Sequence, residues 1–126
     1  MAEAKFYRCK KCGNLHVAIV STKVVPQCCG EPMELLEAGV TDAATEKHVP
    51  AITREGGCLK ATVGEVAHPM TPEHFIQFVA LVTDDRIEVA KLTPESAPEA
   101  TFAVAEDATG SVYEFCNLHG LWKADF

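Results

Sequence analysis

Positive charge is scarce in this sequence, and a long hydrophobic stretch is missing. The 126 residues include 11 Lys and Arg against 18 Asp and Glu, which gives a net charge of −7. Nucleic acid demands a basic surface, so this charge argues against it as a partner. The apolar runs are far too short to cross a membrane, and the first residues do not resemble a signal peptide. We therefore expect a cytoplasmic protein without a membrane partner.

The composition is otherwise that of a folded protein. Hydrophobic residues make up 48% and charged residues 23% of the chain, which suffices for a packed core. The length fits one ordinary domain, or a very small domain joined to a medium one. In the cytoplasm, the six cysteines are more often metal ligands or reactive thiols than disulfides.

The first predicted domain spans residues 1–36 and depends on its cysteines. Short strands are expected at residues 6–8, 15–20 and 33–37. A piece this small normally needs a metal, a disulfide or a partner subunit to fold. The cysteines are Cys9 and Cys12, spaced as a metal-binding knuckle, and the adjacent pair Cys28 and Cys29. Such thiolates suit tetrahedral iron or zinc, and a disulfide between the adjacent cysteines is the alternative.

The second predicted domain, residues 37–126, is a small immunoglobulin-like β-sandwich. After one expected helical turn at 41–46, short strands are expected at residues 51–54, 58–63, 64–68, 74–82, 86–92, 101–105, 112–115 and 121–124. About seven short strands at this spacing, without a long helix, are typical of such a sandwich. The strand at 74–82 is apolar on both faces, as expected inside a sandwich. The predicted fold class is therefore mainly β.

Metal-ligating side chains gather at the predicted ends of these strands. They are His48, His68, His74, Cys116 and His119. A lone histidine is more often structural than a ligand, but a sandwich gathers its loops at its ends, so these residues can converge. Zinc usually stops at four ligands, whereas five ligands with an open position favour a redox metal such as iron. His16 lies outside this pattern and is predicted to be a surface residue.

Two resemblances follow from these motifs. The four-cysteine pattern resembles desulforedoxin, a small rubredoxin-like mononuclear iron protein. Nearly end to end, the chain is similar to the desulfoferrodoxins, the two-iron form of superoxide reductase. The similarity is carried by residues 7–14, 28–29, 46–50, 67–70, 73–77 and 114–123.

The resemblance implies two iron ions. An N-terminal desulforedoxin-like domain would hold the first through its four cysteines. The immunoglobulin-like domain would hold the second through four histidines in a plane and Cys116 on the axis, with one face open. The implied reaction is one-electron reduction of superoxide to hydrogen peroxide, without dismutation to oxygen, as a defence against oxidative stress in an anaerobe. A homodimer and a rubredoxin-like electron donor are implied as partners.

The resemblance also gives expected roles to residues beside the ligands. Lys47 would attract superoxide to the site, and Glu46 would close the sixth position of the ferric state; otherwise both are solvated surface residues. Glu114, two residues before Cys116, is expected to face the same way on its strand. Cys58 is not a ligand in this family.

Two other functions stay open from the sequence. The first is a two-iron electron-transfer protein without superoxide chemistry. The second is a zinc-folded adaptor whose sandwich binds a partner and whose histidines are incidental.

Overall fold

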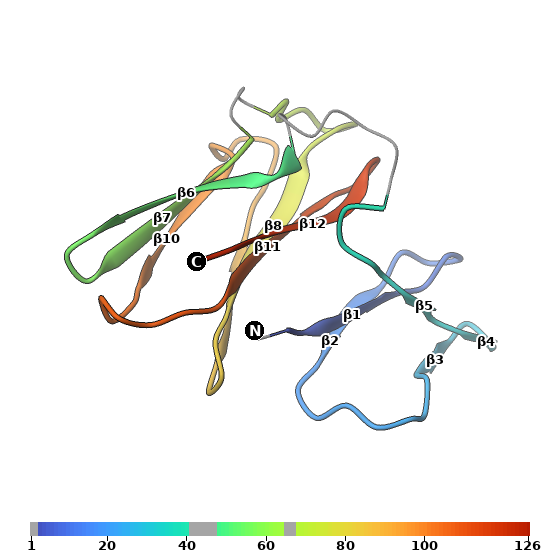
Figure 1. The fold of residues 1–126 in the computed structure, drawn as a ribbon. Coiled ribbons are helices and arrows are strands. Elements are labelled where there is room, and N and C mark those ends of the chain that lie inside the picture. Colours follow the sequence, from blue (N-terminus) through green and yellow to red (C-terminus); the bar gives the residue numbers. More distant parts are fainter. Residues whose placement is uncertain (1–2, 41–47, 65–67) are drawn as a thin grey trace. The chain divides into compact units, whose positions relative to one another are not determined.

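The computed structural model describes residues 3–40, 48–64 and 68–126, and its elements there are twelve β-strands (Figure 1). The chain divides into a small unit, Ala4–Glu37, and a larger unit, which consists of Ala38–Phe126 and the residues before Ala4. The prediction of a mainly β protein is confirmed, and the helical turn predicted at 41–46 lies outside the described residues. No described segment forms a helix with the length and apolar character that a membrane crossing requires.

The small unit contains two little sheets. The first has the strand order β2-β1-β5, with β1 at Lys5–Arg8, β2 at Leu15–Ala18 and β5 at Glu34–Leu35. The second pairs β3, Gln27–Cys28, with β4, Glu31–Pro32. The buried cluster of the small unit consists of Tyr7, Cys9 and Met33. It is too small to stabilise a domain alone. The strand predicted at 33–37 is present but shorter, since β5 covers Glu34–Leu35, and the β3–β4 hairpin before it was missed.

The β3–β4 hairpin determines the geometry of the adjacent cysteines. Cys28 pairs with Glu31 across a two-residue loop, and the loop residues Cys29 and Gly30 have φ angles of 54° and 76°. Positive φ at both positions is the pattern of a type I′ turn, whose twist matches that of the flanking strands. The left-handed region is uncommon for a residue other than glycine. The turn therefore holds Cys29 in a backbone conformation that cysteine rarely adopts.

The larger unit is a two-layered antiparallel sandwich. One sheet has the order β10-β7-β6, with β6 at Pro50–Glu55, β7 at Cys58–Val63 and β10 at Glu99–Ala103. The other has the order β12-β11-β8-β9, with β8 at Ile76–Val82, β9 at Ile87–Lys91, β11 at Ser111–Cys116 and β12 at Gly120–Asp125. The core lies between the sheets and includes Leu59 and Val63 of β7, Val79 and Leu81 of β8, and Val112 of β11.

Most of the predicted strands are present with small shifts of their ends. The hairpin predicted at Gly56 and Gly57 is confirmed, since Glu55 pairs with Cys58 across them. The strand predicted at 74–82 begins only at Ile76, because His74 instead forms an isolated bridge with Thr71. Part of the strand predicted at 64–68 lies outside the described residues.

One end of the four-stranded sheet is irregular. Phe115 pairs with Phe78, but the next residue, Cys116, pairs with Ile76, so Gln77 is left without an opposite residue. Such a bulge changes the direction of a strand and redirects the side chains beyond it. As a result, Ile76 and Cys116 both face the core where β8 begins and β11 ends.

Gly110 provides a test of the packing at the other end of this sheet. A Cβ atom here would collide with the carbonyl oxygen of Val82 and lie 3.0 Å from the Phe126 ring. Overpacking of this kind costs about 1–3 kcal/mol. We therefore expect Gly110→Ala to lower the free energy of unfolding by that amount, measured by chemical denaturation with the fluorescence of Trp122, the single tryptophan.

Gly57→Ala is the matched control, because the nearest atom to its added Cβ is the Val104 carbonyl oxygen at 4.0 Å. Equal losses of stability in the two variants would contradict the packing described at Gly110.

Candidate metal centres

Four cysteine side chains converge in the small unit. The sulfurs of Cys9, Cys12, Cys28 and Cys29, here called the four-cysteine group, lie within 4.8 Å of one another. The Sγ of Cys28 lies 3.6 Å from that of Cys12 and 4.0 Å from that of Cys29. Sulfurs bound tetrahedrally to one metal at about 2.3 Å are about 3.8 Å apart, so these separations fit a shared ion. All six cysteines are free, and the disulfide considered for the adjacent pair is not formed.

The charges of the four-cysteine group also favour a metal. The backbone N–H of Cys12 points at the sulfur of Cys9 at 3.5 Å and lowers the pKa of that thiol to about 6. Contact with the sulfur of Cys12 raises the pKa of Cys29 to about 12. Thiolates this close repel one another, so all four can be deprotonated together only around a cation. The Nδ2 of Asn14 adds a hydrogen bond to the sulfur of Cys28 at 3.6 Å.

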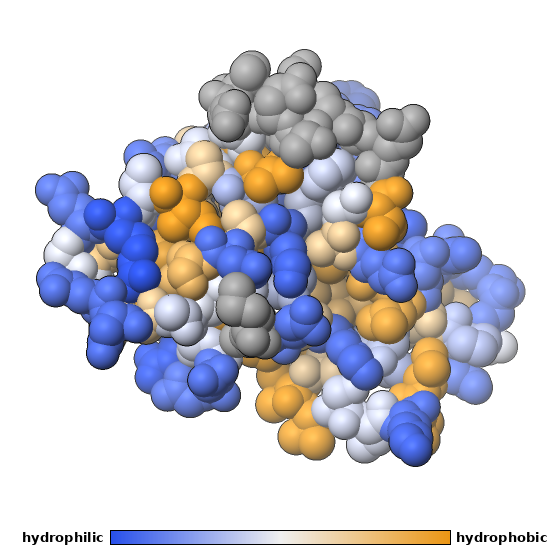
Figure 2. Space-filling view, in the orientation of Figure 1, coloured by the Kyte–Doolittle hydropathy of each residue, from blue (hydrophilic) through white to orange (hydrophobic). Residues whose placement is uncertain are grey.

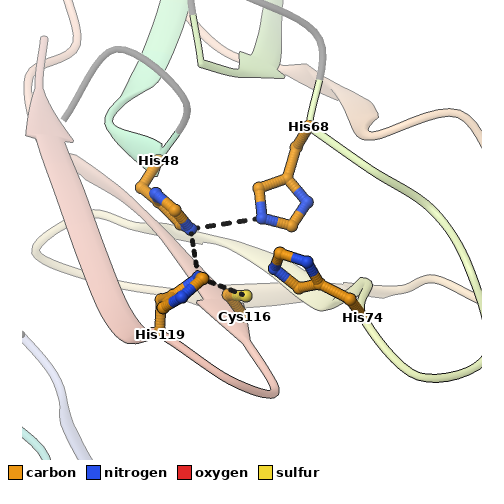
Figure 3. Close-up of side chains that lie close together, drawn as sticks. All are labelled: His48, His68, His74, Cys116 and His119. Carbon is orange, nitrogen blue, oxygen red and sulfur yellow. Dashed lines mark hydrogen bonds between the residues drawn. The ribbon is translucent and has the colours of Figure 1, made fainter. Parts of the chain in front are cut away.

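Four imidazole rings and one sulfur converge in the larger unit (Figure 3). The residues of this histidine–cysteine group are His48, His68, His74, Cys116 and His119, and their ligand atoms lie within 4.8 Å of one another. Neighbouring rings have centroids 4.7 to 5.0 Å apart and follow the closed order His48, His68, His74, His119. Adjacent planes are inclined by 75° to 84°. The rings therefore surround a common centre.

The chain supplies these side chains from segment ends, as predicted. His48 precedes β6, His74 precedes β8, and Cys116 ends β11. His119 lies in the short turn between β11 and β12, and His68 lies in the segment that leads to β8. Antiparallel pairing places the start of β8 beside the end of β11, which explains why residues far apart in the sequence meet here.

The ring nitrogens have the spacing that one ion requires. His48 Nε2 lies 3.1 Å from His119 Nδ1 and 3.2 Å from His68 Nε2. Nitrogens bound at about 2.1 Å are about 3.0 Å apart when they meet at a right angle, and about 3.4 Å apart in a tetrahedron. The 3.1 Å distance is closer to the right-angle value, and the 3.2 Å distance lies midway between the two values. Both distances are short enough for the three nitrogens to bind one ion.

His68 is held as a neutral ring with a lone pair toward this centre. Its Nδ1 lies 2.7 Å from the carbonyl oxygen of Pro69, which only accepts, so Nδ1 carries the proton. Burial lowers the pKa of His68 to about 4. A backbone carbonyl commonly fixes the tautomer of a metal-ligating histidine in this way. Nε2 is then free of a proton and faces His48.

Cys116 reaches the group from the hydrophobic core. Its side chain is fully buried, and its sulfur lies 3.8 Å from His119 Nδ1. Burial raises the pKa of the thiol, while the backbone N–H groups of Leu118 and His119 act against that rise by donating to the sulfur. These two amides stabilise negative charge on the sulfur, so that it can bind a metal as a thiolate.

Glu114 is a carboxyl group inside the core. It is completely buried on β11, and neither carboxyl oxygen has a hydrogen-bond partner among the residues that the structure describes. Burial raises its pKa to about 9, so the group is protonated at neutral pH. Strand alternation places it on the same side as Cys116. The sequence indicated this direction but not the depth of burial.

Trp122 is a supporting residue that the sequence analysis missed. Its indole stacks on His48 at a centroid distance of 5.1 Å and an interplanar angle of 24°. Its Nε1 donates to the carbonyl oxygen of His119 at 3.0 Å. The indole therefore contacts the ring of His48 and the backbone of His119. Its position three residues after His119 was the available signal.

The structure brings together all nine residues predicted as ligands, in the two predicted groups. Their binding of metal stays a prediction. Lys47 and Glu46 lie outside the described residues. His16 is exposed, as predicted, and Cys58 is exposed and belongs to neither group.

Comparison with known proteins identifies the family. The family model described as desulfoferrodoxin matches residues 40–125. A desulfoferrodoxin from Clostridium acetobutylicum is 55% identical over 98 residues, which cover 78% of this chain and 77% of the relative. A desulfoferrodoxin from Nitratidesulfovibrio vulgaris is 43% identical over 121 residues, which cover 96% of this chain and 95% of the relative. The chain belongs to the desulfoferrodoxin family.

A solved structure is similar over nearly the whole chain. The crystal structure of the superoxide reductase from Treponema pallidum has a TM-score of 0.79 and 39% identity, and the match covers 97% of this chain and 98% of that chain. The predicted fold class is confirmed: a small rubredoxin- or desulforedoxin-like metal knuckle followed by an immunoglobulin-like β-sandwich.

The buried His68 predicts a pH dependence for the metal-free protein. Its folded pKa of about 4 lies below the ordinary value of 6.5. The unfolded chain therefore gains a proton here first as the pH falls, and this contribution to stability is lost between about pH 6.5 and 4. It amounts to on the order of 3 kcal/mol. We expect His68→Gln to flatten the fall in unfolding free energy measured between pH 7 and pH 4.5.

His16→Gln, which changes an exposed histidine of the small unit, is the control and should keep the wild-type profile. A His68→Gln protein that loses stability with falling pH as steeply as the wild type would disprove the assignment.

Proposed function

We propose that this chain is a superoxide reductase that acts at the histidine–cysteine group. The observation that carries the proposal is the closed ring of four imidazoles with one cysteine sulfur beside it. A purely structural zinc site is normally four-coordinate and closed. Five donors instead suit a redox metal that keeps a position for a small ligand. Superoxide reductase is also the name of the similar protein from Treponema pallidum.

The two groups fit two iron ions. The four-cysteine group would hold one, and the histidine–cysteine group would hold the other. Ferrous iron held by the second group would supply one electron to superoxide, which with two protons becomes hydrogen peroxide. A closed four-thiolate site has no free position, so the domain predicted at residues 1–36, which contains this group, would serve electron transfer. Residues 37–126 then form the reductase domain.

The charges of the ligands in the second group suit a metal ion that binds the superoxide anion. The four imidazoles are neutral ligands, as the protonated Nδ1 of His68 illustrates. Together with the sulfur of Cys116, they would hold one ion and leave a position for a small ligand. The backbone N–H groups of Leu118 and His119 donate hydrogen bonds to the sulfur of Cys116. These bonds would reduce the electron density that the sulfur donates to a bound metal.

Two residues outside the described part of the chain complete this proposal. Lys47, next to His48, supplies positive charge that draws superoxide toward an otherwise acidic protein. Glu46, two residues before His48, would supply a carboxylate ligand to the oxidised ion. Electrons come from a rubredoxin-like donor, and the protein works in the cytoplasm.

A homodimer is part of the proposal. The β2–β3 loop of the small unit exposes large apolar side chains, with exposed fractions of 78% for Ile19, 83% for Val20 and 79% for Val24. Figure 2 shows hydrophobic surface where this loop runs in Figure 1. Clustered apolar side chains on a soluble surface mark an interaction site, and a second copy of the chain would cover them.

Removal of one ligand tests the function directly. Cys116→Ser and His74→Ala are each expected to abolish superoxide reduction, measured as hydrogen peroxide formed after a pulse of superoxide over the reduced protein. The visible spectrum of the four-cysteine iron should be unchanged, because its ligands belong to another unit.

Cys58→Ser is the control, since Cys58 belongs to neither group. Wild-type rates in either ligand variant would contradict the site assignment. A wild-type protein that binds two irons but forms no peroxide would instead be an electron carrier, and a colourless protein without iron would be the zinc-folded adaptor.

Lys47 can be tested by its charge. Lys47→Ala should lower the second-order rate with superoxide at low salt and weaken the dependence of that rate on ionic strength, because steering is screened by salt. Lys91→Ala, at an exposed lysine on β9, is the control. Identical rates for wild type and Lys47→Ala at low salt would leave Lys47 as a solvated surface residue.

A further inference from the structure

His74 lies outside the strands, so sheet pairing alone does not fix its position. β8 begins two residues later, at Ile76, and the bulge at Gln77 interrupts its pairing with β11. Thr71 bonds to His74 through both backbone groups, at 3.0 and 3.1 Å. Those bonds close a local turn, but they do not connect the turn to the segment that carries Cys116 and His119.

Asn117 makes that connection. Its Oδ1 accepts a hydrogen bond from the Phe75 N–H at 2.9 Å, and its Nδ2 donates to the Glu73 carbonyl oxygen at 3.0 Å. Its own N–H donates to the Phe75 carbonyl oxygen at 3.3 Å. The partners define the orientation of the amide, since an N–H group only donates and a carbonyl oxygen only accepts.

The side chain of Asn117 thus replaces the pairing that the bulge interrupts. An amide offers one acceptor and one donor, as a backbone peptide does. It forms hydrogen bonds with Glu73 and Phe75, the residues on either side of His74. Asn117 itself belongs to the turn between Cys116 and His119. The hydrogen bonds hold three ligand-bearing positions in a fixed relation before any ion binds.

We propose that Asn117 is a positioning residue that holds His74 in register with Cys116 and His119. The proposal rests on the function proposed above, because it assumes that the histidine–cysteine group binds iron. Hydrogen-bonding partners that orient metal ligands typically account for 10–100-fold in metal affinity. Asn117 would do so through the backbone on either side of His74 and not through its imidazole.

A double-mutant cycle on iron release tests this role. Trp122, stacked on His48, reports occupancy of the histidine–cysteine group through its fluorescence while a chelator removes the iron. We expect Asn117→Ala to speed release by about 10-fold in the wild type. In a His74→Ala background, the same change should have less than a ~2-fold effect, because the ligand that it positions is gone.

Equal acceleration in both backgrounds would overturn the proposal, since Asn117 would then act on the fold or on other ligands. Gln77→Ala, an exposed amide beside the same bulge, should release iron at the wild-type rate. Iron release is measured without superoxide. A wild-type protein that binds no iron at this group would therefore refute the proposed function, while additive effects would refute only the role of Asn117.

A second measurement does not require iron. In the metal-free protein, amide hydrogen exchange of Phe75 should be slow in the wild type and faster in Asn117→Ala, with Val79 in β8 unchanged. An unchanged rate at Phe75 would also overturn the proposal.

Discussion

The larger unit depends on one constraint: nitrogen and sulfur atoms with lone pairs must lie close together inside a mostly apolar structure. His48 Nε2 lies only 3.1 and 3.2 Å from two other ring nitrogens, and the sulfur of Cys116 emerges from the core beside them. Two nitrogen lone pairs at such distances repel one another unless a proton or a cation lies between them. A cation at their centre would make this arrangement favourable and would link metal binding to the stability of the fold.

The sandwich brings these atoms together through its strand pairing and the direction of its side chains. Antiparallel pairing brings the start of β8 and the end of β11 together, and the core-facing side of β11 directs Cys116 inward. In the small unit, four sulfur atoms must lie close together. The type I′ turn around Cys29 and the knuckle at Cys9 position them, because this unit has only a small core.

Much of this organisation could be predicted from the sequence. The two-residue spacing between Cys9 and Cys12, the adjacent Cys28 and Cys29, and histidines at predicted strand ends were sufficient for both ligand groups. They identify ligands because metal chemistry restricts which side chains can serve. The sandwich followed from the number and spacing of short apolar segments separated by turns.

The supporting contacts could not be predicted, for a physical reason. The hold of Asn117 on residues 73–75 depends on the bulge at Gln77, and a bulge is a property of the pairing between two strands. The stacking of Trp122 on His48 likewise joins segments that only the folded chain brings together. Glu114 is a polar residue that the pairing of β11 places in the core. Only the structure therefore reveals a buried, protonated carboxyl group two residues before Cys116.

The stoichiometry of the superoxide reaction tests the central claim most directly. A reductase converts each superoxide into one hydrogen peroxide and oxidises the protein, whereas dismutation yields one peroxide and one oxygen from two superoxides. Measured on the reduced protein with limiting superoxide, the account predicts equal amounts of peroxide formed and superoxide consumed, without release of oxygen. Oxygen evolution with half that yield of peroxide, or consumption of superoxide only at its spontaneous rate, would contradict it.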